Sequence, residues 1–149
     1  MNTTAIENIP LAAYGELIPT ARLIPERQRM GFLPKLFGNR LFMLGEGVVY
    51  HFMGDMCSAD TGGLWAFVAI PDGTGYMRPK ANGTYSMSCA GNQWEGDVSA
   101  DAAGIIVTLM ALSQMSFDDQ TDTCAENFHA LRDFVSGHPE AKHIYRAID

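Results

Sequence analysis

The segment SADAAGIIVTLMALSQM, residues 99–115, constrains how the rest of the chain can fold. Between Ala102 and Leu112, Thr108 carries the only hydroxyl group and no side chain is charged. This apolar run is much shorter than the roughly 20 residues that a membrane-spanning helix needs. A helix that is apolar on every side has no face to offer water. We therefore predict that residues 99–115 form a buried helix at the centre of a soluble domain, with Ser99 as its N-cap.

The composition is that of one globular domain. The chain has 149 residues, of which 47% are hydrophobic and 18% are charged, so a core can form without disulfides or metal. The three cysteines lie far apart, and no CxxC or HxxxH pair occurs, so we expect no disulfide framework, no metal site and no cofactor. The opening residues MNTTAIENIP lack the basic segment and the apolar run of a signal peptide. We therefore expect a cytoplasmic protein with no membrane contact.

The net charge of −7 is unevenly distributed along the chain. Residues 1–54 carry a net charge of +1, and residues 55–149 carry −8. The second part will repel nucleic acid, so we expect no direct nucleic-acid binding. It could instead meet a basic surface on another protein.

Short strands grouped between helices predict an α+β fold. Residues 64–98 alternate β-branched and aromatic runs with turn signals such as PDGTG, which predicts a small antiparallel sheet of about four strands. Apolar spacing predicts a helix over residues 39–56, and further helices follow the central one, so that helices from both flanking segments pack on the sheet. We expect residues 1–24 to be a loosely ordered extension and residues 25–149 to be a single domain.

An acidic cluster follows the central helix. It consists of Asp118, Asp119, Asp122 and Glu126. The favoured interpretation is a solvated loop that caps the next helix, with Thr121 or Asp122 as the cap. The functional alternative is a docking patch for a basic partner, and catalytic carboxylates come a distant third because nothing indicates a pocket that would shift a pKa.

Trp65 begins the first predicted strand of residues 64–98. In a strand, Leu64 and Trp65 point to opposite faces. The aliphatic side chains at positions 64, 66, 68 and 70 suit the core, which leaves Trp65 and Phe67 on the other face, under the helices or partly exposed. A core tryptophan is the default interpretation, but exposed tryptophans are enriched at binding hot spots.

Four blocks of the sequence resemble the antirestriction protein family ArdB/KlcA. The blocks are residues 25–38, 57–79, 94–115 and 128–149, and they include the specific strings SADAAGI and HPEAKHIYRAID. The resemblance implies a small α+β protein with a fold of its own, carried by plasmids or other mobile elements. It also implies that the protein is not an enzyme and helps incoming DNA escape type I restriction in the bacterial cytoplasm. Asp60 departs from the family, which often has tyrosine there.

The resemblance leaves the mechanism of antirestriction open. The expected partner is the type I restriction-modification complex or a host protein associated with it. Duplex DNA carries about one charge per 1.7 Å, so a net −7 is sparse for an acidic DNA mimic, which stays as the alternative. A small ligand-binding or hydrolytic enzyme is the alternative of a different class, and a pocket lined by His51, His129 or Cys57 would favour it.

Three residues within or near these blocks are candidates for the interaction site. Arg29 lies in QRMGFLP, Glu46 lies on the polar face of the helix over 39–56, and Trp65 follows a glycine pair. An arginine, a carboxylate and a tryptophan together match the composition of binding hot spots. The alternative interpretation is a structural salt bridge beside a core tryptophan.

Overall fold

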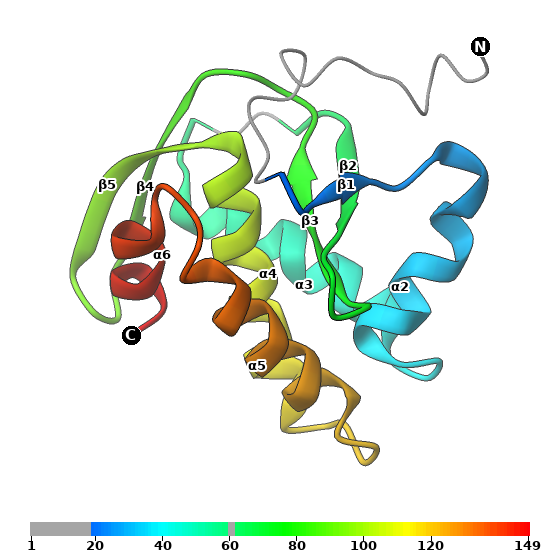
Figure 1. Cartoon of the computed structure of the whole chain (residues 1–149). Coiled ribbons are helices and arrows are strands. Elements are labelled where there is room, and N and C mark those ends of the chain that lie inside the picture. Colours follow the sequence, from blue (N-terminus) through cyan, green and yellow to red (C-terminus); the bar gives the residue numbers. More distant parts are fainter. Residues whose placement is uncertain (1–18, 60–61) are drawn as a thin grey trace, which may run out of the picture.

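The structure, a computed structural model, describes residues 19–59 and 62–149, and this part of the chain contains two small antiparallel sheets and five α-helices (Figure 1). In chain order the elements are β1 (Arg22–Leu23), the short 3-10 helix η2 (Glu26–Gln28), α2 (Arg29–Phe37), α3 (Phe42–Met56), β2 (Trp65–Ala69), β3 (Gly75–Pro79), β4 (Thr84–Cys89), β5 (Trp94–Ser99), α4 (Ala100–Ser116), α5 (Thr123–Val135) and α6 (Ala141–Ile148). The predicted α+β class is confirmed. Within the described ranges, no helix is both long and apolar enough to cross a membrane.

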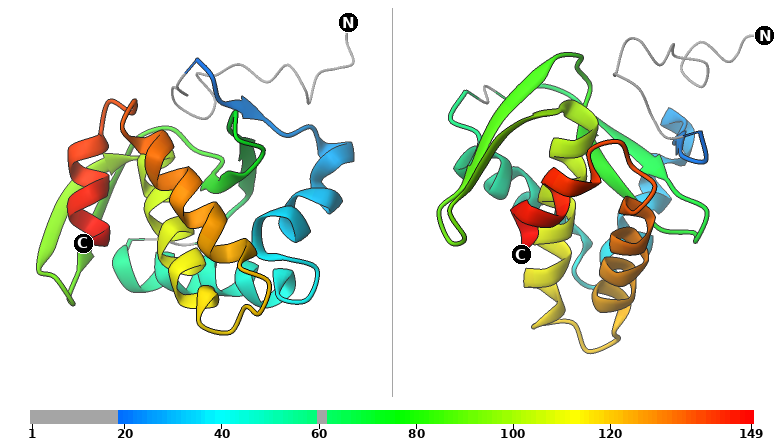
Figure 2. Two further views of the ribbon diagram at one scale, coloured as in Figure 1. Left: turned by 60° about the horizontal axis from the view of Figure 1, so that its bottom comes forward. Right: turned by 60° about the vertical axis from the view of Figure 1, so that its left-hand side comes forward.

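Helix α4 is the central element of the fold, as its sequence predicts. Every residue from Ala100 to Leu109 is buried. The hydroxyl of Ser99 accepts a hydrogen bond from the Ala102 N–H at 3.1 Å, so Ser99 is the N-cap. The views in Figure 2 show α5 and α6 lying on one side of α4, while α3 and the two sheets cover the rest of it.

Helix α4 also closes the edge of the larger sheet. That sheet has the order β1-β2-β3, so among the described residues no strand lies beside the other edge of β3. There the Thr108 hydroxyl accepts a hydrogen bond from Met77 N at 3.1 Å and lies 3.3 Å from Met77 O, to which it can donate. The helix comes this close because residue 104 is glycine: a Cβ at Gly104 would lie 2.3 Å from Met77 O. The Thr108 hydroxyl therefore supplies the hydrogen bonds to Met77 that a neighbouring strand would otherwise make.

The strands predicted over residues 64–98 are all present, but the expected single sheet is corrected to two. Strand β3 pairs with β2, whereas β4 and β5 form a separate hairpin paired from Thr84–Ser99 to Cys89–Trp94. The reason lies in α4, which occupies the edge of β3 that β4 would need. Pro79 ends β3 and has no N–H to donate to a further strand.

Strand β1 was not predicted from the sequence. Arg22 and Leu23 pair with Ala69 and Val68 of β2, and they belong to the segment expected to be an extension. Most of that expectation concerns residues 1–18, which lie outside the described residues, as does Asp60. The domain boundary at residue 25 therefore stays a prediction, although β1 begins three residues before it.

Candidate functional site

Arg29 and Trp65, two of the three candidate interaction residues, contact each other directly. The Arg29 guanidinium donates a hydrogen bond from Nη2 to the carbonyl oxygen of Trp65 at 2.9 Å. It also stacks over the ring of Phe67, with Cζ 4.4 Å from the ring centroid, and pairs with Glu26 at 3.4 Å. Through the hydrogen bond to Trp65, Arg29 links α2 to β2. Its side chain also reaches solvent, because 26% of it is exposed.

Tyr50 connects Glu46 to the same cluster. Its hydroxyl donates a hydrogen bond to Glu46 Oε2 at 3.0 Å, and its ring lies edge-on to Trp65 with centroids 5.3 Å apart. Partial burial of Tyr50, together with the hydrogen bond and negative charge of Glu46, raises the pKa of Tyr50 to about 12, and the positive charge of Arg29 opposes the shift. The structure thus brings the three candidates together around a tyrosine that sequence reasoning missed. Their contact with a partner stays a prediction.

The exposed part of this cluster lies on α3. Met43, Glu46 and Tyr50 are spaced at i, i+3 and i+7, which places them on one face of the helix. Tyr50 is exposed, and Met43 is 75% exposed although it is apolar. We call Arg29, Met43, Glu46 and Tyr50 the Tyr50 surface. Trp65 supports it from beneath.

The expected burial pattern at the start of β2 is wrong at Leu64. Trp65 is only 7% exposed, whereas Leu64, placed in the core by strict alternation, is 74% exposed. Leu64 precedes β2, which begins at Trp65, so the alternation of a strand does not apply to it. Within β2 both faces are covered, and Phe67 stacks on Phe32 of α2 with centroids 4.9 Å apart. Trp65 is therefore a core residue, and its indole is not an exposed anchor.

The acidic cluster divides between a structural carboxylate and exposed ones. Asp119 Oδ2 accepts from the Cys124 N–H at 2.8 Å, and its other oxygen accepts from the Thr121 N–H and hydroxyl. Partial burial alone would raise the pKa of Asp119, but these hydrogen bonds outweigh it and lower the pKa to about 2.

Asp119 thus binds a free backbone N–H in the first turn of α5, a role that the sequence did not indicate. Thr121 and Asp122 were the predicted caps. Asp122 occupies the N-cap position in a left-handed conformation, with φ of 65°, and makes no side-chain capping bond. The carboxylates of Asp118, Asp122 and Glu126 are exposed.

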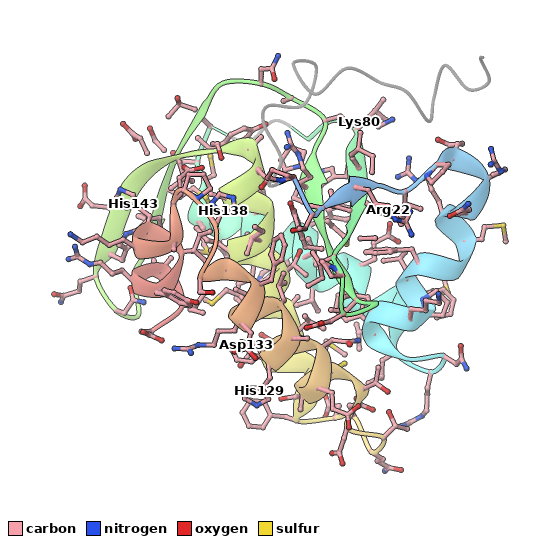
Figure 3. The ribbon with its side chains drawn as sticks, viewed as in Figure 1. Arg22, Lys80, His129, Asp133, His138 and His143 are labelled. Atoms are coloured by element: carbon pink, nitrogen blue, oxygen red, sulfur yellow. The ribbon has the colours of Figure 1, made fainter. Side chains whose placement is uncertain are left out.

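A buried polar cluster joins β3, α4 and the segment between α5 and α6, where Figure 3 labels His138. Asp101 Oδ1 accepts from the Tyr76 hydroxyl at 2.6 Å and from Arg78 Nη1 at 3.3 Å, while Asp101 Oδ2 lies 2.9 Å from His138 Nε2. Burial, followed by the charge of Asp101, raises the pKa of Tyr76 well above its usual value. Asp101 was not singled out from the sequence, although a carboxylate beside an apolar run is a signal for a buried partner.

The hydrogen bonds fix the protonation of His138 in this cluster. Its Nδ1 accepts the backbone N–H of Glu140 at 2.9 Å, so Nδ1 carries no proton and the ring is the neutral form with a proton on Nε2. Nε2 then donates to Asp101. Arg78 supplies one positive charge and Asp101 one negative charge, so the cluster is neutral and its carboxylate is fully hydrogen-bonded. This arrangement holds three segments of the chain together.

Three surface cavities formed by the described residues bear on the enzyme alternative. None of the three is lined by His51, His129 or Cys57, the residues that the enzyme alternative requires. His51 Nε2 lies 3.1 Å from Asp55 on the exposed surface of α3, outside these cavities. Over residues 19–59 and 62–149, no three His, Cys, Asp or Glu side chains are grouped so as to hold a metal ion.

Comparison with known proteins identifies the family. A family model described as "Antirestriction protein" matches residues 59–149. The Escherichia coli "Antirestriction protein KlcA" is 42% identical over 134 residues, which cover 87% of this chain and 94% of the relative. The chain belongs to the antirestriction protein family. A "Putative antirestriction protein YubI" of Escherichia coli K12 is 35% identical over 88% of this chain and 96% of its own length.

A solved structure of the same family matches the fold. It covers 90% of this chain and 98% of its own, with a TM-score of 0.79 and 45% sequence identity. It comes from work on the KlcA and ArdB proteins, which show a novel fold and antirestriction activity against type I DNA restriction systems in vivo but not in vitro. The α+β architecture described above is therefore the family's own fold. Trp65, the buried cluster and the acidic residues lie inside the family match, whereas Arg29 and Glu46 precede it.

Proposed function

We propose that the protein protects incoming mobile-element DNA from type I restriction enzymes in the cytoplasm of a bacterial host, as a binding protein without catalytic activity. The observation that carries this proposal is the match over nearly the whole chain to a structure whose family is active against type I systems. The closed, neutral state of the buried Asp101 cluster supports a non-catalytic role.

The partner is the type I restriction-modification complex or a host protein associated with it. Activity of KlcA and ArdB in cells but not with isolated components favours a target that needs a further host component. A DNA mimic is the weaker alternative here, because its carboxylates would have to be exposed and regularly spaced. In this chain Asp101 is buried against Arg78, and Asp119 is engaged in hydrogen bonds at the start of α5.

The Tyr50 surface is the proposed contact for this partner. It combines a partly exposed arginine, an aromatic ring and a carboxylate with the exposed apolar side chain of Met43. Tyrosine and arginine are the residue types enriched in interface hot spots, and the buried Trp65 beneath them holds the Tyr50 ring in place. Asp118, Asp122 and Glu126 form a second candidate contact, which a basic partner would use.

A plating experiment tests both the function and the surface. Unmodified phage is plated on a type I restricting strain with and without the protein, and methylation of the surviving phage is scored in parallel. We expect restored plating with continued methylation. No restoration by a folded, well-expressed protein contradicts the function.

A matched pair of variants separates the surface from the fold. Met43→Asp adds a charge to the Tyr50 surface, and Phe117→Asp adds one to another exposed apolar side chain, just after α4. Both variants should keep the thermal midpoint of the wild type, because both side chains lie in solvent. Loss of plating only in Met43→Asp supports the surface. Equal plating by the two variants rejects it.

A further inference from the structure

A cavity of about 560 Å³ lies between β1, η2 and α2 and the loop that joins β2 to β3. Its volume is in the range of small-molecule sites. It shares no residue with the Tyr50 surface or with the acidic cluster. Figure 3 shows Arg22 on the β1 side of this region, facing the helical segment formed by η2 and α2.

The cavity is basic in a protein whose net charge is −7. Arg22 from β1 and Lys35 from α2 line it, and no Asp or Glu does. Neither of these two side chains forms an ion pair or a hydrogen bond with another residue of the structure's described part. Two cations at one cavity that lack a partner among the described residues attract an anion, and the planar guanidinium of arginine suits phosphate oxygens.

The wall of the cavity carries an unsatisfied hydroxyl as well. Thr74 lines the cavity and is only 5% exposed, and its Oγ1 is buried without a hydrogen-bond partner among the described residues. Buried polar atoms without a partner are rare in native structures and require an explanation. The atom is buried as it stands, so a rotation of the Thr74 side chain toward the cavity would let an oxygen atom of a bound ligand supply the missing partner.

The remaining lining sets the size and character of the ligand. Ile24 and Phe32 add an apolar wall, and Gln28 adds an uncharged amide beside the two cations. At Gly31, a Cβ would meet no atom within 4 Å, so the site stays open along α2. Apolar walls with a few convergent polar groups are typical of sites for small organic ligands.

We propose that this cavity binds a small phosphorylated organic molecule about the size of a mononucleotide, with its phosphate between Arg22 and Lys35. The ligand's organic part lies against Ile24 and Phe32, and one of its oxygens pairs with the Thr74 hydroxyl. The proposal rests on the cavity alone and not on the antirestriction role, so either can fail without the other.

The first test is a titration of the full chain by calorimetry with AMP and UMP. Adenosine and inorganic phosphate serve as the two half-ligands. We expect saturable binding of at least one nucleotide, and binding at least ~10-fold weaker for both half-ligands. Lack of saturable binding by both nucleotides overturns the proposal. Inorganic phosphate that binds as tightly as the nucleotides also overturns it, because the site would then recognise a free anion only.

Variants test the assigned contacts without damaging the fold. Arg22→Gln and Lys35→Gln each remove one charge from exposed side chains, and each should weaken nucleotide binding ~10-fold. Thr74→Val keeps the shape of the side chain and removes a hydroxyl that has no partner among residues 19–59 and 62–149, so it should weaken binding without lowering the thermal midpoint. Unchanged affinity in both charge variants overturns the site.

Gly31 offers a matched pair of variants for the same site. Gly31→Glu and Gly31→Gln place side chains of nearly equal size at a position with open space, and only the first is charged. Repulsion of a phosphate predicts that Gly31→Glu binds at least ~5-fold more weakly than Gly31→Gln. Equal binding by the two variants shows that no anion lies near α2 and contradicts the proposal.

Discussion

Replacing Gly104 of α4 by alanine separates helix propensity from packing, because the two effects have opposite signs. In an isolated helix, alanine is about 1 kcal/mol more favourable than glycine. Propensity alone therefore predicts that Gly104→Ala stabilises the protein.

Packing against β3 reverses that expectation. The new Cβ would lie 2.3 Å from Met77 O, 2.5 Å from Arg78 Cβ and 2.6 Å from Arg78 Cα, and two of these three atoms belong to the backbone. Overpacking of this kind costs about 1–3 kcal/mol. Moving α4 away also weakens the two Thr108–Met77 hydrogen bonds, each worth about 1 kcal/mol. After the gain in propensity, we expect a net loss of about 1–4 kcal/mol.

Equilibrium unfolding in urea, followed by circular dichroism, measures this loss. Gly47→Ala in α3 is the matched control, since a Cβ there would meet no atom within 4 Å. It should raise the free energy of unfolding by about 0.5–1 kcal/mol. A Gly104→Ala protein as stable as the wild type or more stable would refute the close approach of α4 to β3.

Three further predictions concern the same framework. Thr108→Val keeps the side-chain shape but leaves the N–H and C=O of Met77 without their partner, so it should lower the free energy of unfolding by about 1–3 kcal/mol, and Thr108→Ser should restore most of the loss in the same urea assay. Asp119→Ala removes hydrogen bonds at the start of α5 and should cost about 0.5–2 kcal/mol at pH 7. Because the pKa of Asp119 is lowered to about 2, this stabilisation is present above the unfolded pKa near 4 and is lost as the pH falls toward 2. The melting temperatures of the wild type and of Asp119→Ala should therefore converge at low pH. A difference in melting temperature that stays constant with pH would contradict the assignment. Burial, together with the charge of Asp119, raises the pKa of Cys124 to about 12, so iodoacetamide should label it far more slowly than the half-buried Cys89 in the native protein, as peptide mass spectrometry would measure.

The sequence predicts the elements of this fold better than their partners. The uninterrupted apolar run of α4 has one physical solution, a buried helix, so its position and its Ser99 cap follow from local information. The division of the strands into two sheets depends on the contact between Thr108 and Met77, which are 31 residues apart in the chain. Turn signals between strands predict where each strand ends, but they do not predict which strand or helix packs against its edge.

The candidate site shows the same limit. Arg29, Glu46 and Trp65 could be selected by residue type, and the structure places them around one ring. Tyr50, which connects them, carried no signal of its own, because its role depends on the contact of its ring with Trp65, 15 residues further along the chain. Alternation placed Leu64 inside because it let the strand begin at residue 64, whereas β2 begins at Trp65. It also assumed one covered face, whereas β2 is covered on both.

The contact between Thr108 and β3 also bears on how the protein behaves at high concentration. An unpaired strand edge is a template on which a second chain can add, which is a route to aggregation. Here the free edge of β3 is covered by a helix of the same molecule, and its Met77 backbone groups are already hydrogen-bonded. The opposite edge of the sheet is β1, which is only two residues long. The larger sheet is therefore limited at both sides, and crowding should not extend it from one molecule to the next.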